Sequence, residues 1–158
     1  MTLRVVRSNL NDPQDQNNFR TLLRTYIIDN MGRGYIIVPE NPLLERSLQG
    51  VCQHPTSRVY FGYVDEVCAG MAVCFEVYST FQAAPVINIH DMIVAPKYRR
   101  YGVAREILNH IEQEASLIGV KKLTLEVRSD NFPAQNLYRR LGFRECAPLM
   151  YFWVKQLN

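Results

Sequence analysis

The chain has 158 residues, 47% of them hydrophobic and 21% charged, with a net charge of +3. This composition is typical of one globular domain with a sizeable core, which we expect over residues 1–158. There is no run of about 18 apolar residues, which argues against a membrane span. Arg4 and Arg7 interrupt the apolar start, which argues against a secretory leader. The expected location is therefore the cytoplasm, with no membrane partner.

The four cysteines provide no sign of a metal centre. None of them forms a C-x-x-C pair, and no histidine spacing completes a zinc site. They are expected to be small buried hydrophobes in a reducing compartment. Their positions are Cys52, Cys68, Cys74 and Cys146.

The first half of the chain predicts strands and two helices. Asp12 and Pro13 suit the N-cap and first position of one helix, and Asn41-Pro42 starts a second that His54-Pro55 stops. Residues 32–39 should form a loop or a short extended piece between them. A hairpin follows, turned at Asp65-Glu66. The expected strands are 3–7, 58–64 and 67–78.

Alternation along 67–78 places Glu76 on the same face as Cys74 and Gly70. It is the only charge inside this strand, and a carboxylate there is costly unless it is paired or near water. A plain exposed strand end and a site residue explain it equally well.

The second half predicts a strand, a basic loop, a helix and a parallel strand. In the first of these strands His90 should alternate with Ile89, Asp91 and Ile93. A short helix begins near Pro133. The expected ranges are strands 86–94 and 121–127, helix 102–118, and closing strands 143–144 and 149–155.

The basic loop and the helix start after it suit a bound phosphate. The sequence from 94 to 105 is VAPKYRRYGVAR, with Gly102 at the turn into the helix. Free N–H groups at a helix N-terminus and nearby guanidinium groups both favour an anion. An ordinary loop with solvated arginines would have a similar sequence, because short glycine motifs are weakly specific.

Two motifs together resemble the GNAT superfamily of N-acetyltransferases. Arg99-x-x-Gly102-x-Ala104 matches its coenzyme A motif, and residues 131–143, NFPAQNLYRRLGF, match its second signature in the expected order. The resemblance implies an α/β (α+β) fold with a mixed, mostly antiparallel, splayed sheet of six to seven strands and four helices. Two strands of this sheet separate beside the cofactor.

The resemblance implies acetyl-CoA as cosubstrate, with no metal. The pantetheine arm would take backbone N–H groups at the end of strand 86–94, and the loop would hold the pyrophosphate. Asn131 and Ala134 would lie beside the arm, although Asn131 is also a plausible helix cap. The cofactor residues so implied in the strand and loop are Met92, Ile93, Val94, Arg99, Arg100, Tyr101, Gly102, Val103, Ala104 and Arg105.

The catalytic residues implied are an acid and a base. Tyr138 matches the family tyrosine that donates a proton to the leaving thiolate, although its periodicity also suits a core aromatic. Many relatives have Glu-Asp where this chain has His90-Asp91. His90 can exchange a proton near neutral pH and is one candidate base. Glu76 is its rival.

The expected activity is acetyl transfer to a primary amine by direct attack in a ternary complex. The alternative is a non-catalytic module that binds coenzyme A as a sensor or scaffold. The acceptor would be a small-molecule or peptide amine. Glu40 and Glu45 could face it, although solvated surface charges are the simpler explanation. The family also leaves a homodimer open, whereas the arginines are too localised for a nucleic-acid surface.

Overall fold

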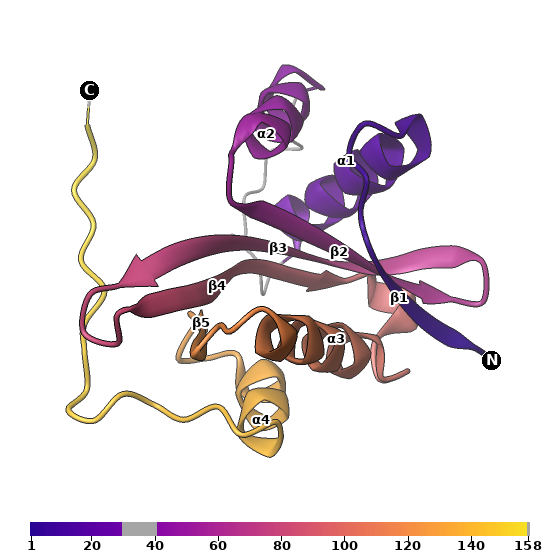
Figure 1. Cartoon of the computed structure of the whole chain (residues 1–158). Coiled ribbons are helices and arrows are strands. Elements are labelled where there is room, and N and C mark those ends of the chain that lie inside the picture. Colours follow the sequence, from indigo (N-terminus) through magenta and orange to yellow (C-terminus); the bar gives the residue numbers. More distant parts are fainter. Residues whose placement is uncertain (30–40, 158) are drawn as a thin grey trace. The chain divides into compact units, whose positions relative to one another are not determined.

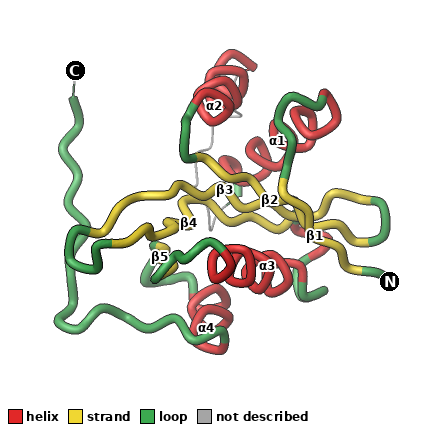
Figure 2. Tube along the Cα trace, in the orientation of Figure 1, coloured by secondary structure: helices red, strands yellow, loops and turns green. Residues whose placement is uncertain are grey.

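The structure is a computed structural model that describes residues 1–29 and 41–157. They form two compact units, Met1–Glu126 and Val127–Asn158. In the first unit, a five-stranded sheet runs in the order β1-β2-β3-β4-β5, with α1 and α2 on one face and α3 on the other (Figures 1 and 2). Its elements are β1 (Leu3–Arg7), α1 (Pro13–Ile28), α2 (Asn41–Gln53), β2 (Ser57–Val64), β3 (Val67–Ser79), β4 (Ala84–Val94), the 3₁₀ turn η1 (Pro96–Tyr98), α3 (Val103–Leu117) and β5 (Lys122–Leu125).

The predicted helix start at Asp12 is confirmed. Its carboxylate Oδ1 accepts hydrogen bonds from the N–H groups of Gln14, at 2.7 Å, and Asp15, at 3.2 Å. These bonds satisfy two of the N–H groups that a helix leaves without an internal partner. The predicted loop 32–39 lies outside the described residues.

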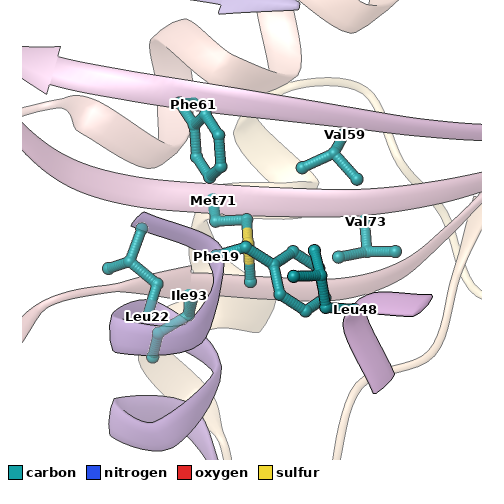
Figure 3. Close-up of a cluster of buried hydrophobic side chains, with 8 residues drawn as sticks. All are labelled: Phe19, Leu22, Leu48, Val59, Phe61, Met71, Val73 and Ile93. Atoms are coloured by element: carbon teal, nitrogen blue, oxygen red, sulfur yellow. The ribbon is translucent and has the colours of Figure 1, made fainter. Parts of the chain in front are cut away.

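The core between the sheet and the α1–α2 layer is built from alternate residues of the central strands (Figure 3). Phe61 from β2 and Met71 from β3 are fully buried against Phe19 and Leu22 of α1. Their burial is the main force that holds these helices on the sheet. The remaining members of the cluster are Leu48, Val59, Val73 and Ile93.

Two glycines on the opposite face allow α3 to approach the sheet closely. Gly62 of β2 and Gly70 of β3 are directly paired. A Cβ atom at Gly62 would lie 2.8 Å from Val103 Cγ1, and one at Gly70 would lie 2.9 Å from it. The space that a side chain would occupy is therefore filled by the first turn of α3, which fixes where that helix begins.

A bulge in β4 corrects the predicted alternation of that strand. Val73 of β3 pairs with Asp91, but the next residue, Cys74, pairs with Ile89. His90 is the extra residue of this β-bulge. Ile89 consequently lies on the face of Cys74, toward α3, whereas Asp91 lies on the opposite face with Val73.

The second unit contains one helix, α4 (Phe132–Arg140), and no strand among residues 127–157. The prediction of closing strands at 143–144 and 149–155 was therefore wrong, and the sheet has five strands rather than six or seven. Composition suits a strand, but a strand also needs a neighbour for its backbone hydrogen bonds. The large apolar side chains from Leu149 to Val154 are exposed.

No helix within the described ranges is long and apolar enough to cross a membrane. The cysteines there belong to two classes. Cys74 is buried and Cys68 is partly buried, and burial raises the pKa of each thiol to about 12. Such thiols act as small apolar groups at neutral pH. Cys52 and Cys146 are exposed, which corrects the expectation that all four are buried.

Candidate active site

The pairing between β4 and β5 ends before β4 does. The two parallel strands pair from Val86 with Lys122 to Ile89 with Leu125, where β5 ends. β4 continues to Val94 and stays paired with β3 along this stretch. In the first unit, the stretch from His90 to Val94 therefore has one edge that β5 does not cover.

The hydrogen-bond pattern identifies the amides that point toward this open edge. The N–H of Ala95 donates to the carbonyl of Ala69, at 2.8 Å, so Ala95 faces β3. Alternation in an antiparallel ladder turns Ile93 toward β3 as well, and turns Met92 and Val94 toward the open edge. The carbonyl of Val94 also points away from β3, because it accepts a hydrogen bond from Nε of Arg99 outside the ladder.

The loop after β4 ends in an N-terminus that carries no side-chain cap. Gly102 is the N-cap of α3 and has a φ of +88°, a left-handed conformation that glycine adopts without strain. Arg100 also has a positive φ, +71°. Gly102 has no side chain to satisfy the first N–H groups of α3, those of Val103, Ala104 and Arg105. The Val103 side chain is buried, so only its backbone faces the loop.

The basic side chains of the loop are arranged in two ways. Nη2 of Arg99 donates to Oδ2 of Asp29, which follows α1, and its Nε donates to the Val94 carbonyl. Arg100 and Arg105 are exposed, and neither has a hydrogen bond or ion pair with the described parts of the chain. The exposed Tyr101 packs edge-to-face on Tyr98, whose ring also receives the Lys97 ammonium.

The bulge places His90 on the face of the sheet that carries α1 and α2. Its exposed imidazole lies edge-to-face with the ring of Phe75, with ring centroids 5.6 Å apart. His54, just after α2, contacts the same ring at 4.7 Å. Phe75 packs against the core cluster of this face, so its two histidine neighbours lie there too.

Glu76 lies on the other face of the sheet. Its Oε2 accepts a hydrogen bond from Nη2 of Arg58 at 2.7 Å. Nη1 of Arg58 donates to Glu114 of α3 at 2.9 Å, and Arg7 reaches the same carboxylate oxygen of Glu114 at 3.0 Å. The two candidate bases, Glu76 and His90, are thus separated by the sheet.

Of the two glutamates that could face an acceptor, the described part of the chain includes Glu45, which is paired with an arginine. Arg20 and Glu45 form a two-point ion pair, with Nε to Oε1 at 2.6 Å and Nη2 to Oε2 at 3.0 Å. Hydrogen bonding to Arg20 lowers the pKa of the Glu45 carboxyl. The charge of Glu45 is therefore already engaged. Glu40 lies outside the described residues.

The second unit carries the other motif around α4. Asn131 is the N-cap, and its side-chain oxygen accepts a hydrogen bond from the N–H of Ala134 at 3.3 Å. Tyr138 is partly buried, and its ring contacts Phe143 edge-to-face at 5.8 Å. The N–H of Phe143 donates to the Tyr138 carbonyl, and Gly142 between them has a φ of +90°. The Leu-Tyr-x-x-x-Gly-Phe pattern thus forms the turn that ends α4.

Sequence reasoning missed three features of this region. Asp29 was not linked to the loop, because its partner Arg99 is 70 residues away. The bulge at His90 has no glycine or proline to indicate it. The pairing of Gly62 with Gly70 had a visible signal, since glycine inside a strand often marks close approach of another element.

Comparison with known proteins identifies the family. The model of the acetyltransferase (GNAT) family matches residues 23–143. The ribosomal protein bS18-alanine N-acetyltransferase of Escherichia coli (strain K12) is 42% identical over 58 residues, which make up 37% of this chain and 39% of that protein. An uncharacterized N-acetyltransferase from the hisH-hisA intergenic region of Azospirillum brasilense is 32% identical over 98 residues, covering 61% of this chain and 58% of that protein. The aligned regions thus span less than two thirds of these relatives.

Solved structures share the fold over nearly the whole chain. A probable acetyltransferase has a TM-score of 0.82 at 21% identity, covering 98% of this chain and 99% of its own. The structure of AAC(6')-Iy in complex with a bisubstrate analogue, CoA-S-monomethyl-acetylneamine, has a TM-score of 0.77 at 16% identity. The similarity covers 99% of this chain and 100% of that one. Together with the family match over most of the sequence, these similarities establish that the chain belongs to the GNAT acetyltransferase family.

Proposed function

We propose that this protein transfers an acetyl group from acetyl-CoA to a primary amine by direct attack in a ternary complex. The observation that carries the proposal is the open edge of β4, which leads through η1 and the basic loop to the uncapped N-terminus of α3. An extended amide-containing chain can pair with such an edge, while its anionic end meets the helix. The family match runs across the boundary between the two units, which supports one catalytic domain.

Acetyl-CoA would be held at two places. The amides of Met92 and Val94 would pair with the pantetheine arm and polarise the thioester carbonyl, a role that needs preformed donors. The N–H groups from Gly102 to Arg105 would receive the pyrophosphate, with Arg100 and Arg105 as the nearby cations. Tyr101, Asn131 and Ala134 remain candidates from the motifs.

The chemistry needs two proton transfers around one bond exchange. The amine nitrogen attacks the thioester carbonyl carbon, and the tetrahedral adduct then expels coenzyme A as the carbon–sulfur bond breaks. A base removes a proton from the nitrogen, and an acid returns one to the sulfur. We assign the acid to Tyr138, on the strength of the motif that surrounds it.

We assign the base to His90 in preference to Glu76. His90 lies at the bulge, beside the amides of the open edge, and its imidazole is exposed. Glu76 accepts a charge-assisted hydrogen bond from Arg58 on the face toward α3. The carboxylate of Glu76 is thus already engaged by Arg58, and the sheet separates it from His90.

The acceptor is proposed to be an amine of a peptide or small molecule. Relatives of this chain are named for alanine of a ribosomal protein, for streptothricin and for an aminoglycoside 6'-amine. To test the activity, the protein is incubated with acetyl-CoA and a panel that includes trialanine amide and sisomicin, while release of free thiol is recorded. Thiol release that depends on an amine supports acetyl transfer. Thermal stabilisation by coenzyme A without thiol release would instead favour the non-catalytic module.

Replacing the two candidate bases should separate them by pH dependence. His90→Gln is expected to lower kcat by about 10²-fold and to alter the acidic limb of the pH profile, because glutamine cannot accept the amine proton as an imidazole can. Glu76→Gln should keep that acidic limb. The measurement is kcat against pH for both variants with one amine. A profile unchanged in His90→Gln would exclude this histidine as the base.

A further inference from the structure

We infer that Arg99 is a positioning residue that joins the end of α1 to the cofactor loop, and that it does not bind the pyrophosphate itself. This inference rests on the proposed function. It divides three arginines into one internal clamp, Arg99, and two cations available to a ligand, Arg100 of the loop and Arg105 in the first turn of α3.

The contacts of Arg99 use both ends of its guanidinium group. Nη2 forms an ion pair with Asp29, whose side chain is 12% exposed, and Nε donates to the carbonyl of Val94 at 3.2 Å. The backbone N–H of Arg99 donates to the carbonyl of Pro96 at 3.2 Å, which closes η1. Asp29 itself is held by its backbone N–H, which donates to Tyr26 in the last turn of α1 at 3.3 Å. One side chain thus ties together the last residue of β4, the loop and α1.

The hydrogen bond from Arg99 to the Val94 carbonyl indicates that this arginine has a positioning role. The Val94 carbonyl lies on the open edge of β4 and belongs to the residue whose amide is proposed to pair with the cofactor arm. An arginine fork held by a carboxylate on one side and this carbonyl on the other has a fixed direction. To reach a pyrophosphate it would have to break its charge-assisted bond to Asp29, whereas Arg100 and Arg105 would break no bond within the described chain.

The clamp also connects the two substrates. Helix α1 lies in the same layer as α2 (Figure 1), whose Glu45 is a candidate to face the acceptor, and the loop belongs to the cofactor side. Since Asp29 follows α1 directly, the position of the helix end depends on the loop through this pair. Loss of either partner should therefore disturb both substrates, and loss of both should do no more harm than loss of one.

The test is a double-mutant cycle of Asp29→Asn and Arg99→Met, read by calorimetry with coenzyme A. Each single variant is expected to weaken binding by about three- to tenfold, and the double variant by no more than the worse single one. Arg100→Met should weaken binding more strongly at low salt than at high salt, because it removes a cation that faces the ligand. Arg99→Met should weaken coenzyme A binding by the same factor at low and at high salt. Glu145→Gln, which removes an exposed ion pair of the second unit, is the control with unchanged binding.

A kinetic measurement separates positioning from a general loss of stability. With trialanine amide as acceptor, Asp29→Asn and Arg99→Met should raise the acceptor KM by a similar factor while kcat changes less than twofold. Arg99→Lys, which keeps the charge, should recover part of the loss. The inference is overturned if Asp29→Asn leaves coenzyme A binding unchanged while Arg99→Met weakens it in a salt-dependent way. Failure of the wild-type protein to bind coenzyme A would instead contradict the proposed function.

Discussion

Replacing Tyr138 with phenylalanine is expected to lower kcat by about 10²-fold, corresponding to about 2.7 kcal/mol of transition-state stabilisation. The leaving group is a thiolate that must gain a proton, and the substitution removes only the hydroxyl that would provide it. The ring remains to pack against Phe143, so α4 should stay folded. The measurement is steady-state kinetics, together with calorimetry of coenzyme A binding, which should be unchanged.

The matched control is Tyr78→Phe, which removes a hydroxyl from an exposed tyrosine at the end of β3. It is expected to change neither kcat nor binding. Near-normal turnover in Tyr138→Phe would remove this residue from the mechanism. A loss of binding equal to the loss of turnover would show that the residue holds the cofactor instead of donating a proton.

Replacing Gly70 with alanine is expected to destabilise the fold by about 1–3 kcal/mol, the usual cost of overpacking a core. The new Cβ would lie 2.9 Å from Val103 Cγ1 and 3.0 Å from the backbone carbonyl of Ile93. Neither neighbour can turn aside easily, because valine is branched at Cβ and the carbonyl belongs to the sheet. Urea unfolding measures the loss in the free energy of unfolding. In thermal unfolding, we expect a Tm lower by roughly 2–4 °C for each kcal/mol lost in a chain of this size.

The same substitution should also weaken coenzyme A binding, since Val103 is the first residue of α3 and Ile93 lies in the open stretch of β4. The matched control is Gly50→Ala in α2, where nothing lies within 4 Å of the new Cβ. Because alanine favours a helix over glycine, it should stabilise the protein by about 0.5–1 kcal/mol. Equal stability of the two variants would mean that α3 does not depend on the glycine pair.

Local signals in the sequence predicted most of the elements of the first unit. The Asp12-Pro13 cap, the hairpin turn at Asp65-Glu66 and the parallel pairing of β4 with β5 are all confirmed. Each depends on residues close in sequence or on the handedness of one connection. The closing strands failed for the opposite reason, since a strand depends on a distant partner that composition does not specify.

The candidate site was predictable in its chemistry but not in its detailed geometry. The motif around Gly102 located the start of α3 to within a residue. The face of the sheet on which His90 lies was not predictable, because one extra residue in β4 reverses the alternation of side chains on which that prediction depends. The clamp of Arg99 on Asp29 was equally hidden, since an ion pair between distant segments leaves no periodic pattern.

Amide hydrogen exchange of β4, followed residue by residue by NMR with and without coenzyme A, tests the central claim most directly. The amide of Ile93 should be protected in both states, because it faces β3. The amides of Met92 and Val94 should exchange fast in the free protein and become at least tenfold slower when coenzyme A binds. The claim is contradicted if coenzyme A binds and these two amides remain unprotected, or if both are already as slow as Ile93 in its absence.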